Sequence, residues 1–418
     1  MPVRPKFSQR LQDIEPFRVV EVLGRATELE AAGRDIVYLV AGEPDFATAG
    51  PIVEAGRQAL AQGHTYYSQA GGIPQLREAL SGWYADEYGL SVDPRRIMIT
   101  PGASGALLLL SSLLLNPGEH MLLPDPGYPC NRHFLRLVEG RGELVPVGPE
   151  NGFQLSAELV RSHWREGTVG AMVASPSNPV GGVLNRRQLR ELSQAVTAQS
   201  GYLIVDEIYH GLSYGVETPS ILEFDDDAFV ISSFSKYFGM TGWRLGWLVA
   251  PEAAIPELEK LSQNLFISMS TMSQYAALAG FEPATRAILD ARRDQFAQRR
   301  DFLLPELERL GFEVPQYPHG AFYIYAAIDR FSPDSQAFCL EMLEQHGIAL
   351  TPGADFGGHR ANHYVRFAYT TGMERIEEAV ARLDRVLGSA GLPERARTSL
   401  SEATHSPGGV RADSAGEA

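Results

Sequence analysis

The amino-acid sequence predicts an α/β protein whose large domain holds a mostly parallel, doubly wound sheet. Three observations predict it. Short apolar runs alternate with helical patterns through the middle of the chain. Several of these runs are apolar throughout, which is typical of strands covered on both faces. The chain has 418 residues, more than one hydrophobic core usually supports, so we expect a second domain.

The predicted strands follow from the apolar runs in order. They are residues 97–100, 121–124, 144–147, 171–174, 202–205, 229–231 and 245–249. Helical patterns occupy residues 103–115 and 188–199 between them. Strands that alternate with helices indicate a parallel sheet with helices on both faces.

The ends of the chain predict a smaller α+β domain built from both termini. A helical stretch at 273–280 precedes a long charged helix at 283–309, which would join the two domains. Strand patterns follow at 320–326 and 365–369, with helices at 335–346 and 373–387. We expect residues 1–48 and 286–388 to form the small domain and residues 49–285 the large one. Residues 389–418 lack aromatic residues and an apolar period, so we expect a disordered tail; a segment that folds on a partner is the alternative.

Composition narrows the class of function. The 36 basic and 51 acidic residues leave a net charge of −15, which argues against nucleic acid and anionic membranes as partners. Only two cysteines, Cys130 and Cys339, are present, so a reducing, cytoplasmic setting is expected. The N-terminus lacks the apolar region of a secretory signal, and the longest mostly apolar run, 106–115, is too short to span a bilayer. We expect a soluble protein.

Chemically useful residues follow the predicted strands. Because ligands of open α/β sheets bind at the carboxyl ends of the strands, these loops are expected to meet. They read Pro-Gly-Ala-Ser-Gly at 101–105, Asp-Pro-Gly-Tyr at 125–128, Ser-Pro-Ser-Asn-Pro at 175–179, Asp-Glu-Ile-Tyr at 206–209 and Ser-Ser-Phe-Ser-Lys at 232–236. Together they supply an anion cradle, an aromatic face, an amide, a carboxylate, a phenol and a lysine.

The anion cradle has a physical basis. Backbone N–H groups of Gly102, Ala103 and Ser104 would point outward at a helix start, where the helix dipole also favours an anion. A set of two hydroxyls and a guanidinium, those of Ser233, Ser235 and Arg244, would complete a site for a phosphate dianion. An ordinary helix start also explains the glycine-rich turn alone.

Lys236 is the most informative residue. It follows an apolar strand and lies among Ser, Phe and Gly. Partial desolvation there would favour the neutral, nucleophilic amine. The alternative is a lysine whose amine reaches out of a loop into solvent.

The run from Ser233 to Gly246, Ser-Phe-Ser-Lys-Tyr-Phe-Gly-Met-Thr-Gly-Trp-Arg-Leu-Gly, resembles the cofactor-lysine motif of the class I/II aminotransferases. These are fold-type-I pyridoxal-phosphate-dependent transferases of the aspartate aminotransferase superfamily. The resemblance extends over residues 14–387. Its landmarks are Gly-Glu-Pro-Asp-Phe at 42–46, Tyr-Tyr-Ser-Gln-Ala-Gly-Gly-Ile-Pro at 66–74, Pro-Gly-Tyr-Pro at 126–129, Ser-Asn-Pro at 177–179, Asp-Glu-x-Tyr at 206–209, Gly-Ala-Phe-Tyr at 320–323 and Val-Arg-Phe-Ala at 365–368.

The resemblance implies roles around pyridoxal 5′-phosphate, which Lys236 would hold as a Schiff base. Asp206 would pair with the pyridine nitrogen and keep it protonated; a helix N-cap or surface carboxylate is the alternative. Tyr209 and Asn178 would donate to the phenolic oxygen, and Tyr128 would stack on the ring unless it only packs in the core. No metal is expected.

The resemblance also implies a substrate site and a homodimer. Arg366 would clamp the α-carboxylate in two parallel hydrogen bonds, with help from Gly42 and Asn178; a cross-strand ion pair is the alternative. Tyr67 would reach the phosphate of a neighbouring subunit, because the family's active site lies at a dimer interface. Tyr66 is the nearby alternative.

The activity implied is transamination, in amino-acid metabolism. Lys236, once displaced by an amino acid, would move the α-proton, and a 2-oxo acid would then reverse the steps in ping-pong kinetics. The same fold hosts carbon–sulfur β-lyases, racemases and aminocyclopropane-forming enzymes, and the β-lyase is the main alternative. A transcription regulator is a further one, but we expect no room for its DNA-binding domain.

The choice of amino donor and 2-oxo acid acceptor stays open. Aspartate-specific relatives of the prokaryotic type carry a lysine where this chain has Ser104 or a neighbour, so an aspartate preference is in doubt. Arg132 and His133 are candidates for a recognition charge, although a solvated loop explains them too. Phe17, Val20 and Phe266 are candidates for an apolar side-chain pocket, or for core packing.

Overall fold

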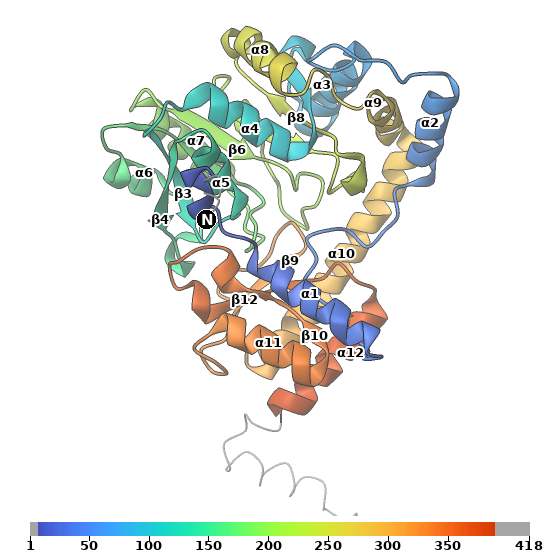
Figure 1. Cartoon of the computed structure of the whole chain (residues 1–418), viewed down its shortest axis with the longest axis vertical. Coiled ribbons are helices and arrows are strands. Elements are labelled where there is room, and N and C mark those ends of the chain that lie inside the picture. Colours follow the sequence, from blue (N-terminus) through green and yellow to red (C-terminus); the bar gives the residue numbers. More distant parts are fainter. Residues whose placement is uncertain (1–6, 389–418) are drawn as a thin grey trace, which may run out of the picture.

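The computed structural model describes residues 7–388. They form two lobes, with one long helix running from one to the other (Figure 1). The expected tail at 389–418 lies outside the described residues. The α/β class with a mostly parallel central sheet is confirmed, whereas the boundaries expected at residues 48/49 and 285/286 stay a prediction.

The large lobe is built on a seven-stranded sheet of order β2-β8-β7-β6-β5-β3-β4. Only β8 runs antiparallel to its neighbours. The strands are β2 (Ile97–Thr100), β3 (His120–Asp125), β4 (Arg141–Pro146), β5 (Thr168–Ala174), β6 (Tyr202–Asp206), β7 (Phe229–Ser233) and β8 (Gly246–Val249). Each predicted strand is present, with ends shifted by up to three residues.

Both faces of this sheet are buried, which explains the continuous apolar runs. In β6, Leu203 and Val205 pack into one hydrophobic cluster and Ile204 into another. Helices cover the two faces (Figure 1). The large-lobe helices are α2 (Gly50–Ala61), α3 (Pro74–Tyr88), α4 (Gly102–Leu114), α5 (Cys130–Leu137), α6 (Ala157–His163), α7 (Arg186–Thr197), α8 (Ile255–Leu265) and α9 (Thr271–Leu278).

The small lobe combines the two ends of the chain. Strand β1 (Val37–Tyr38) pairs with β10 (Ile348–Ala349), and a second sheet has the order β11-β12-β9. Its strands are β9 (Tyr323–Ala327), β11 (Thr351–Pro352) and β12 (Tyr364–Ala368). Helices α1 (Arg18–Ala31), α11 (Ser335–His346) and α12 (Met373–Leu383) pack around these strands (Figure 1). The predicted last helix is interrupted, because a π-helical turn occupies Asp384–Gly388.

Helix α10 (Pro283–Leu310) links the lobes. Proline at its first position fits a helix start, and Gly311, with φ 96°, ends it in the left-handed conformation. Its 28 residues span roughly 42 Å at 1.5 Å per residue. Arg299 in this helix donates to Asp45 through both terminal nitrogens, at 2.8 and 3.0 Å. The segment just before α2 is thereby tied to the linking helix.

Candidate active site

A cavity of about 360 Å³ lies at the carboxyl ends of β5, β6 and β7, between the two lobes. Parallel neighbours bring Ala174, Asp206 and the residues after Ser233 to the same sheet edge. Twelve of the predicted cofactor- and substrate-binding residues line it: Gly42, Ala103, Ser104, Tyr128, Asn178, Asp206, Tyr209, Ser233, Ser235, Lys236, Arg244 and Arg366. The structure therefore brings most of the predicted site together.

Lys236 lies in the turn that follows β7, and its Nζ donates to the backbone oxygen of Gly42 at 2.6 Å. Burial, followed by the positive charge of Arg366, lowers the pKa of Lys236 to about 8. Among the described residues, no carboxylate lies within ion-pair distance of this amine. A buried amine without an anionic partner is a poor structural cation but a good nucleophile.

Asp206 ends β6 and is 6% exposed. Burial raises its pKa to about 7, although the backbone N–H of Ile208, which donates to Oδ1 at 3.0 Å, and the charge of Lys236 both oppose that rise. A cationic ring nitrogen beside it would return the carboxyl to its ionised form. The site is thus suited to a positively charged heterocycle.

The predicted anion cradle is assembled from two strand ends. The Oγ of Ser233 donates to the Leu245 carbonyl at 3.1 Å and lies 2.9 Å from Ser235 Oγ. Gly102 has φ 70°, and a Cβ there would lie 2.6 Å from Nη2 of Arg244. A Cβ on Gly246 would lie 2.9 Å from the Ala103 nitrogen. Close backbone approach at both glycines leaves the hydroxyls, the guanidinium and the start of α4 around a space suited to a small anion. Gly102 shapes this cradle without lining the cavity itself.

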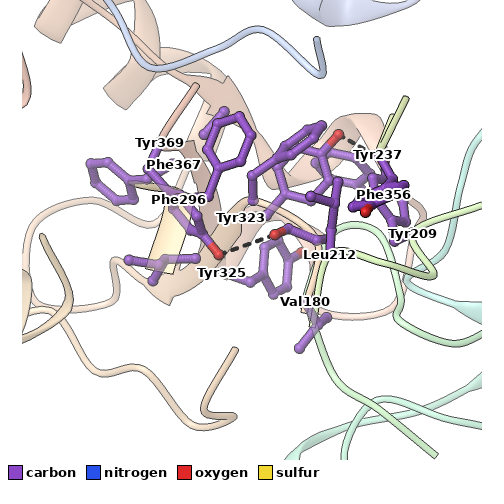
Figure 2. Close-up of a cluster of buried hydrophobic side chains, with 14 of the residues drawn as sticks. Val180, Tyr209, Leu212, Tyr237, Phe296, Tyr323, Tyr325, Phe356, Phe367 and Tyr369 are labelled. Carbon is purple, nitrogen blue, oxygen red and sulfur yellow. Dashed lines mark hydrogen bonds between the residues drawn. The ribbon is translucent and has the colours of Figure 1, made fainter. Parts of the chain in front are cut away.

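Two tyrosines connect the lobes at the cavity. The hydroxyl groups of Tyr209, after β6, and Tyr323, in β9, lie 2.8 Å apart. Figure 2 shows both rings within a cluster of buried aromatic side chains that also includes Phe356. Tyr323 also limits residue 42, because a Cβ there would lie 2.8 Å from its hydroxyl. The region around Gly42 is therefore held close to the small lobe.

Arg366 lies in β12 and is 6% exposed. Its Nη1 donates to Asn178 Oδ1 at 2.9 Å, and its Nη2 donates to the Val40 carbonyl at 3.0 Å. The guanidinium stacks 4.1 Å from the ring centroid of Tyr323, and its buried Nε has no hydrogen-bond partner among the described residues. No cross-strand carboxylate pairs with it in that part of the chain. Such an anchored guanidinium is suited to bind a ligand carboxylate.

The structure corrects the expected apolar pocket. Phe17 lines the cavity, but Val20 is 57% exposed and its neighbour Val19 takes the predicted position. One residue along a helix turns the side chain by about 100°, so the wrong member of the pair was chosen. For Phe266 the alternative, core packing, is confirmed, because it packs against the core after α8.

The candidate recognition charges Arg132 and His133 do not line this cavity. They lie in helix α5 and not in a loop, and Arg132 pairs with Glu15 at 3.2 Å. Tyr67 and Tyr66 lie between α2 and α3, outside the cavity, and are 80% and 84% exposed. Neither tyrosine is brought to the site within one chain.

Ten residues that line the cavity had no predicted role. Five of them carry polar groups or lie beside Arg366: Glu43, Thr241, Tyr323, Asp355 and Phe356. Glu43 and Tyr323 lie inside the Gly-Glu-Pro-Asp-Phe and Gly-Ala-Phe-Tyr landmarks, which marked the family resemblance without giving these two residues a role. Thr241 donates to Glu43, a contact between residues 198 positions apart that no local pattern reveals. Asp355 and Phe356 lay outside every quoted motif.

Two other kinds of feature, clusters of metal-ligating side chains and membrane-spanning helices, are absent from the described residues. In the described part of the chain, no group of three His, Cys, Asp or Glu side chains is arranged to hold a metal ion. No helix within residues 7–388 is both long and apolar enough to cross a membrane.

Comparison with protein families and with solved structures adds to this geometry. Residues 34–383 match the family model described as aminotransferase class I and II. A (5-formylfuran-3-yl)methyl phosphate transaminase of Methanocaldococcus jannaschii is 36% identical, covering 91% of this chain and 99% of the relative. A valine–pyruvate aminotransferase of Mycobacterium tuberculosis is 36% identical over 90% of this chain and 97% of its own length. An aspartate/prephenate aminotransferase of Thermus thermophilus is 36% identical over 92% and 99%.

Solved structures show the same likeness. An aminotransferase from Mycobacterium tuberculosis superposes with a TM-score of 0.89 at 35% identity, over 92% of this chain and 100% of that one. The aspartate aminotransferase of Thermus thermophilus with maleate superposes with a TM-score of 0.86 at 35% identity, over 91% and 100%.

Proposed function

Because the chain belongs to the class I and II aminotransferases, a family of pyridoxal-phosphate-dependent transaminases, we propose that Lys236 holds the cofactor in this transaminase. The enzyme would move an amino group from an L-amino acid to a 2-oxo acid in ping-pong fashion. The observation that carries the proposal is the Lys236 amine, which lies in one cavity with Asp206, the Ser233–Ser235 cradle and Arg366 and has no carboxylate partner among the described residues.

The residues present fit pyridoxal 5′-phosphate. Gly102 and Gly246 make room for a small anion beside Arg244, since a Cβ at either would collide. Asp206 offers a buried carboxyl for the ring nitrogen, and Tyr209 a hydroxyl for the ring oxygen. Tyr128 supplies an aromatic face on the same cavity. When bound, the cofactor withdraws electrons from the α-carbon of its amino acid.

The chain's own groups then have separate tasks. The Lys236 amine, whose lowered pKa keeps part of it neutral near pH 8, would take the α-proton and deliver it to the carbon on the other side of the amino nitrogen, the cofactor's aldehyde carbon. Arg366 binds the α-carboxylate through N–H groups that are already aimed by Asn178 and Val40. The ionised Asp206 keeps the ring nitrogen protonated.

We also propose a homodimer in which Tyr67 reaches the cofactor phosphate of the neighbouring subunit. Two consecutive tyrosines that are 84% and 80% exposed are unusual in a monomer surface. The backbone oxygen of Tyr66 accepts from Thr271 Oγ1 at 2.6 Å, so the segment is fixed while its rings point outward. The cytoplasmic location stays a prediction.

The visible absorbance of the purified protein tests the activity. Single amino acids are added without any 2-oxo acid. We expect one or more of them to convert the aldehyde form of the cofactor to its amine form and release the matching 2-oxo acid. Accumulation of pyruvate and ammonia with an unchanged band would instead identify a β-lyase.

Borohydride reduction followed by peptide mass analysis tests the lysine. The chain contains three lysines, Lys6, Lys236 and Lys260, so the assignment is simple. We expect the cofactor on the peptide with Lys236. Cofactor on either of the others, or on none, would contradict the proposal.

A further inference from the structure

The charges on the cavity wall are unevenly distributed. Among the described residues that line it, the basic ones are Lys236, Arg244 and Arg366. Each has a task at the cofactor amine, the phosphate or the α-carboxylate. No further basic side chain of the described residues lines the cavity to receive a second carboxylate from the substrate.

Beside Arg366, the part of the wall formed by the start of α1 and residues 355–356 is apolar apart from one acidic residue. Phe17 and Val19, at the start of α1, face the cavity together with Phe356. The acidic residue is Asp355, which is 6% exposed. A substrate side chain held near Arg366 would therefore meet hydrocarbon and a carboxyl group.

Asp355 is fixed in this position by the start of α1. The backbone N–H of Arg18 donates to its Oδ1 at 2.7 Å, across 337 residues of sequence. The charges of Asp355 and Arg366 act on each other, and the pKa of the Cys130 thiol is raised by burial and by the charge of Asp355. Burial raises the pKa of Asp355, whereas the N–H groups of Arg18 and Val19 lower it.

A distal substrate carboxylate would be strongly disfavoured beside this wall. It would lose its hydration without gaining a cationic partner among the described residues, which is unfavourable for a buried ion. It would also face a fixed carboxyl that is already oriented by α1. Rejection by an unpaired or like charge is an effective way to obtain specificity.

We propose that this active site selects amino acids and 2-oxo acids with uncharged side chains, and that Asp355 is the residue that rejects a distal carboxylate. The inference rests on the proposed function, because it names the substrate class of the same site. It concerns both halves of the reaction, so a neutral 2-oxo acid such as pyruvate is the expected acceptor and 2-oxoglutarate a poor one.

The first test compares alanine, valine and leucine with aspartate and glutamate in the half-reaction of the cofactor-loaded enzyme. We expect kcat/KM for the acidic pair to be at least about 100-fold lower than for the best neutral donor. Equal rates for acidic and neutral donors would overturn the inference and leave the proposed function intact. A partner subunit that supplied a cation would give that result.

The second test uses Asp355→Asn, which keeps an oxygen for the Arg18 N–H and removes the charge. We expect the aspartate-to-valine ratio of kcat/KM to rise at least about tenfold. The matched control is Asp334→Asn, because Asp334 caps helix α11 through Gln336 and Ala337 but does not line the cavity. An unchanged ratio in Asp355→Asn would contradict the role of this residue.

Calorimetry gives a readout that does not depend on turnover. Succinate and 3-methylbutanoate are titrated into the wild-type protein and into Asp355→Asn. We expect the wild type to bind 3-methylbutanoate more tightly than succinate. In Asp355→Asn, the ratio of the two dissociation constants should be closer to one. Tighter binding of succinate to the wild type would overturn the inference, whereas a failure of every amino acid to react would overturn the proposed function.

Discussion

The two walls of the cavity are built in different ways. On the large-lobe side, Asp206 and Ser233 end neighbouring strands of one sheet, and Lys236 follows within three residues. On the small-lobe side, Phe17, Asp355 and Arg366 come from opposite ends of the chain and meet through contacts such as Arg18 to Asp355. The first wall is set by sheet register, the second by tertiary packing.

This difference separates chemistry from selection. Groups proposed to act on the cofactor need fixed distances, which a hydrogen-bonded sheet provides. Groups proposed to select the substrate lie on α1 and on turns, where a substitution need not disturb the sheet. We therefore expect changes on the large-lobe wall to abolish the reaction and changes on the small-lobe wall to alter which substrate reacts.

Lys236→Ala gives the strongest test of the expectation that changes on the large-lobe wall abolish the reaction. We expect loss of the amine to lower kcat by at least about 10⁴-fold, since proton transfer and cofactor attachment both depend on it. The free energy of unfolding of the cofactor-free protein should not fall, because a desolvated amine is removed. Lys260→Ala, at an exposed lysine paired with Glu257, should leave both quantities unchanged. Turnover of Lys236→Ala at the original rate would contradict the assignment.

Arg366→Lys tests the small-lobe wall. A lysine keeps the charge but loses the planar fork that binds a carboxylate. We expect kcat/KM to drop about 100-fold, mainly through KM, measured in the half-reaction. The control is Arg375→Lys, which changes a surface arginine paired with Asp35. A drop confined to kcat would mean that Arg366 takes part in the reaction step. It would then contradict the division between a reacting large-lobe wall and a substrate-binding small-lobe wall.

Asp206→Asn tests how much the buried carboxyl on the large-lobe wall reduces the stability of the cofactor-free protein. Burial raises the pKa of this carboxyl to about 7 in the folded protein, from 3.8, so its stabilising contribution is complete below about pH 4 and is lost as the pH rises through 7. We expect Asp206→Asn to gain up to a few kcal/mol over the cofactor-free wild type between pH 5 and 8. Urea unfolding at several pH values measures it.

A second variant identifies the source of that effect. Burial raises the pKa of Glu207 to about 8, so this carboxyl also destabilises the fold as the pH rises. In Glu207→Gln only the Asp206 carboxyl contributes, and the free energy of unfolding should stop falling near pH 7. A wild-type stability that rises steadily from pH 5 to 8, with no difference from Asp206→Asn, would contradict the burial argument.

Tyr323→Phe should have the smallest effect. It removes the hydroxyl contact with Tyr209 between the lobes but keeps the ring beneath Arg366. We expect kcat/KM to fall less than about tenfold, as for one neutral hydrogen bond. Tyr325→Phe is the matched control, because the buried hydroxyl of Tyr325 has no hydrogen-bond partner among the described residues. A larger loss would mean that the tyrosine pair takes part in the chemistry.

The large-lobe wall could be predicted from the sequence because its residues follow apolar strands at short range. Strand period, strand ends and the motif around Lys236 together located Asp206, Ser233 and Arg244. Parallel pairing then brings such residues to one edge without further information. The predicted helix at 335–346 matches its bounds because Asp334 caps it and Gly347 ends it.

The small-lobe wall could be predicted only in part. Arg366 was identified through the family motif, but Asp355 was not, because its partner Arg18 is 337 residues away. The choice of Val20 over Val19 failed because the exact start of α1 fixes which side chain faces the cavity. Helix phase of this kind depends on tertiary contacts that a single sequence does not contain.

The pairing of β1 with β10 has a consequence for synthesis on the ribosome. Val37 and Ile348 are sequence-distant partners, and at 5–20 residues per second the ribosome needs on the order of tens of seconds to make the intervening chain. During that time α1 and β1 have emerged without the surfaces they cover. The central sheet, whose strands end at Val249, is complete about a hundred residues before β10 exists. The nascent protein would therefore complete the wall proposed to hold the cofactor first, and the wall proposed to select the substrate last.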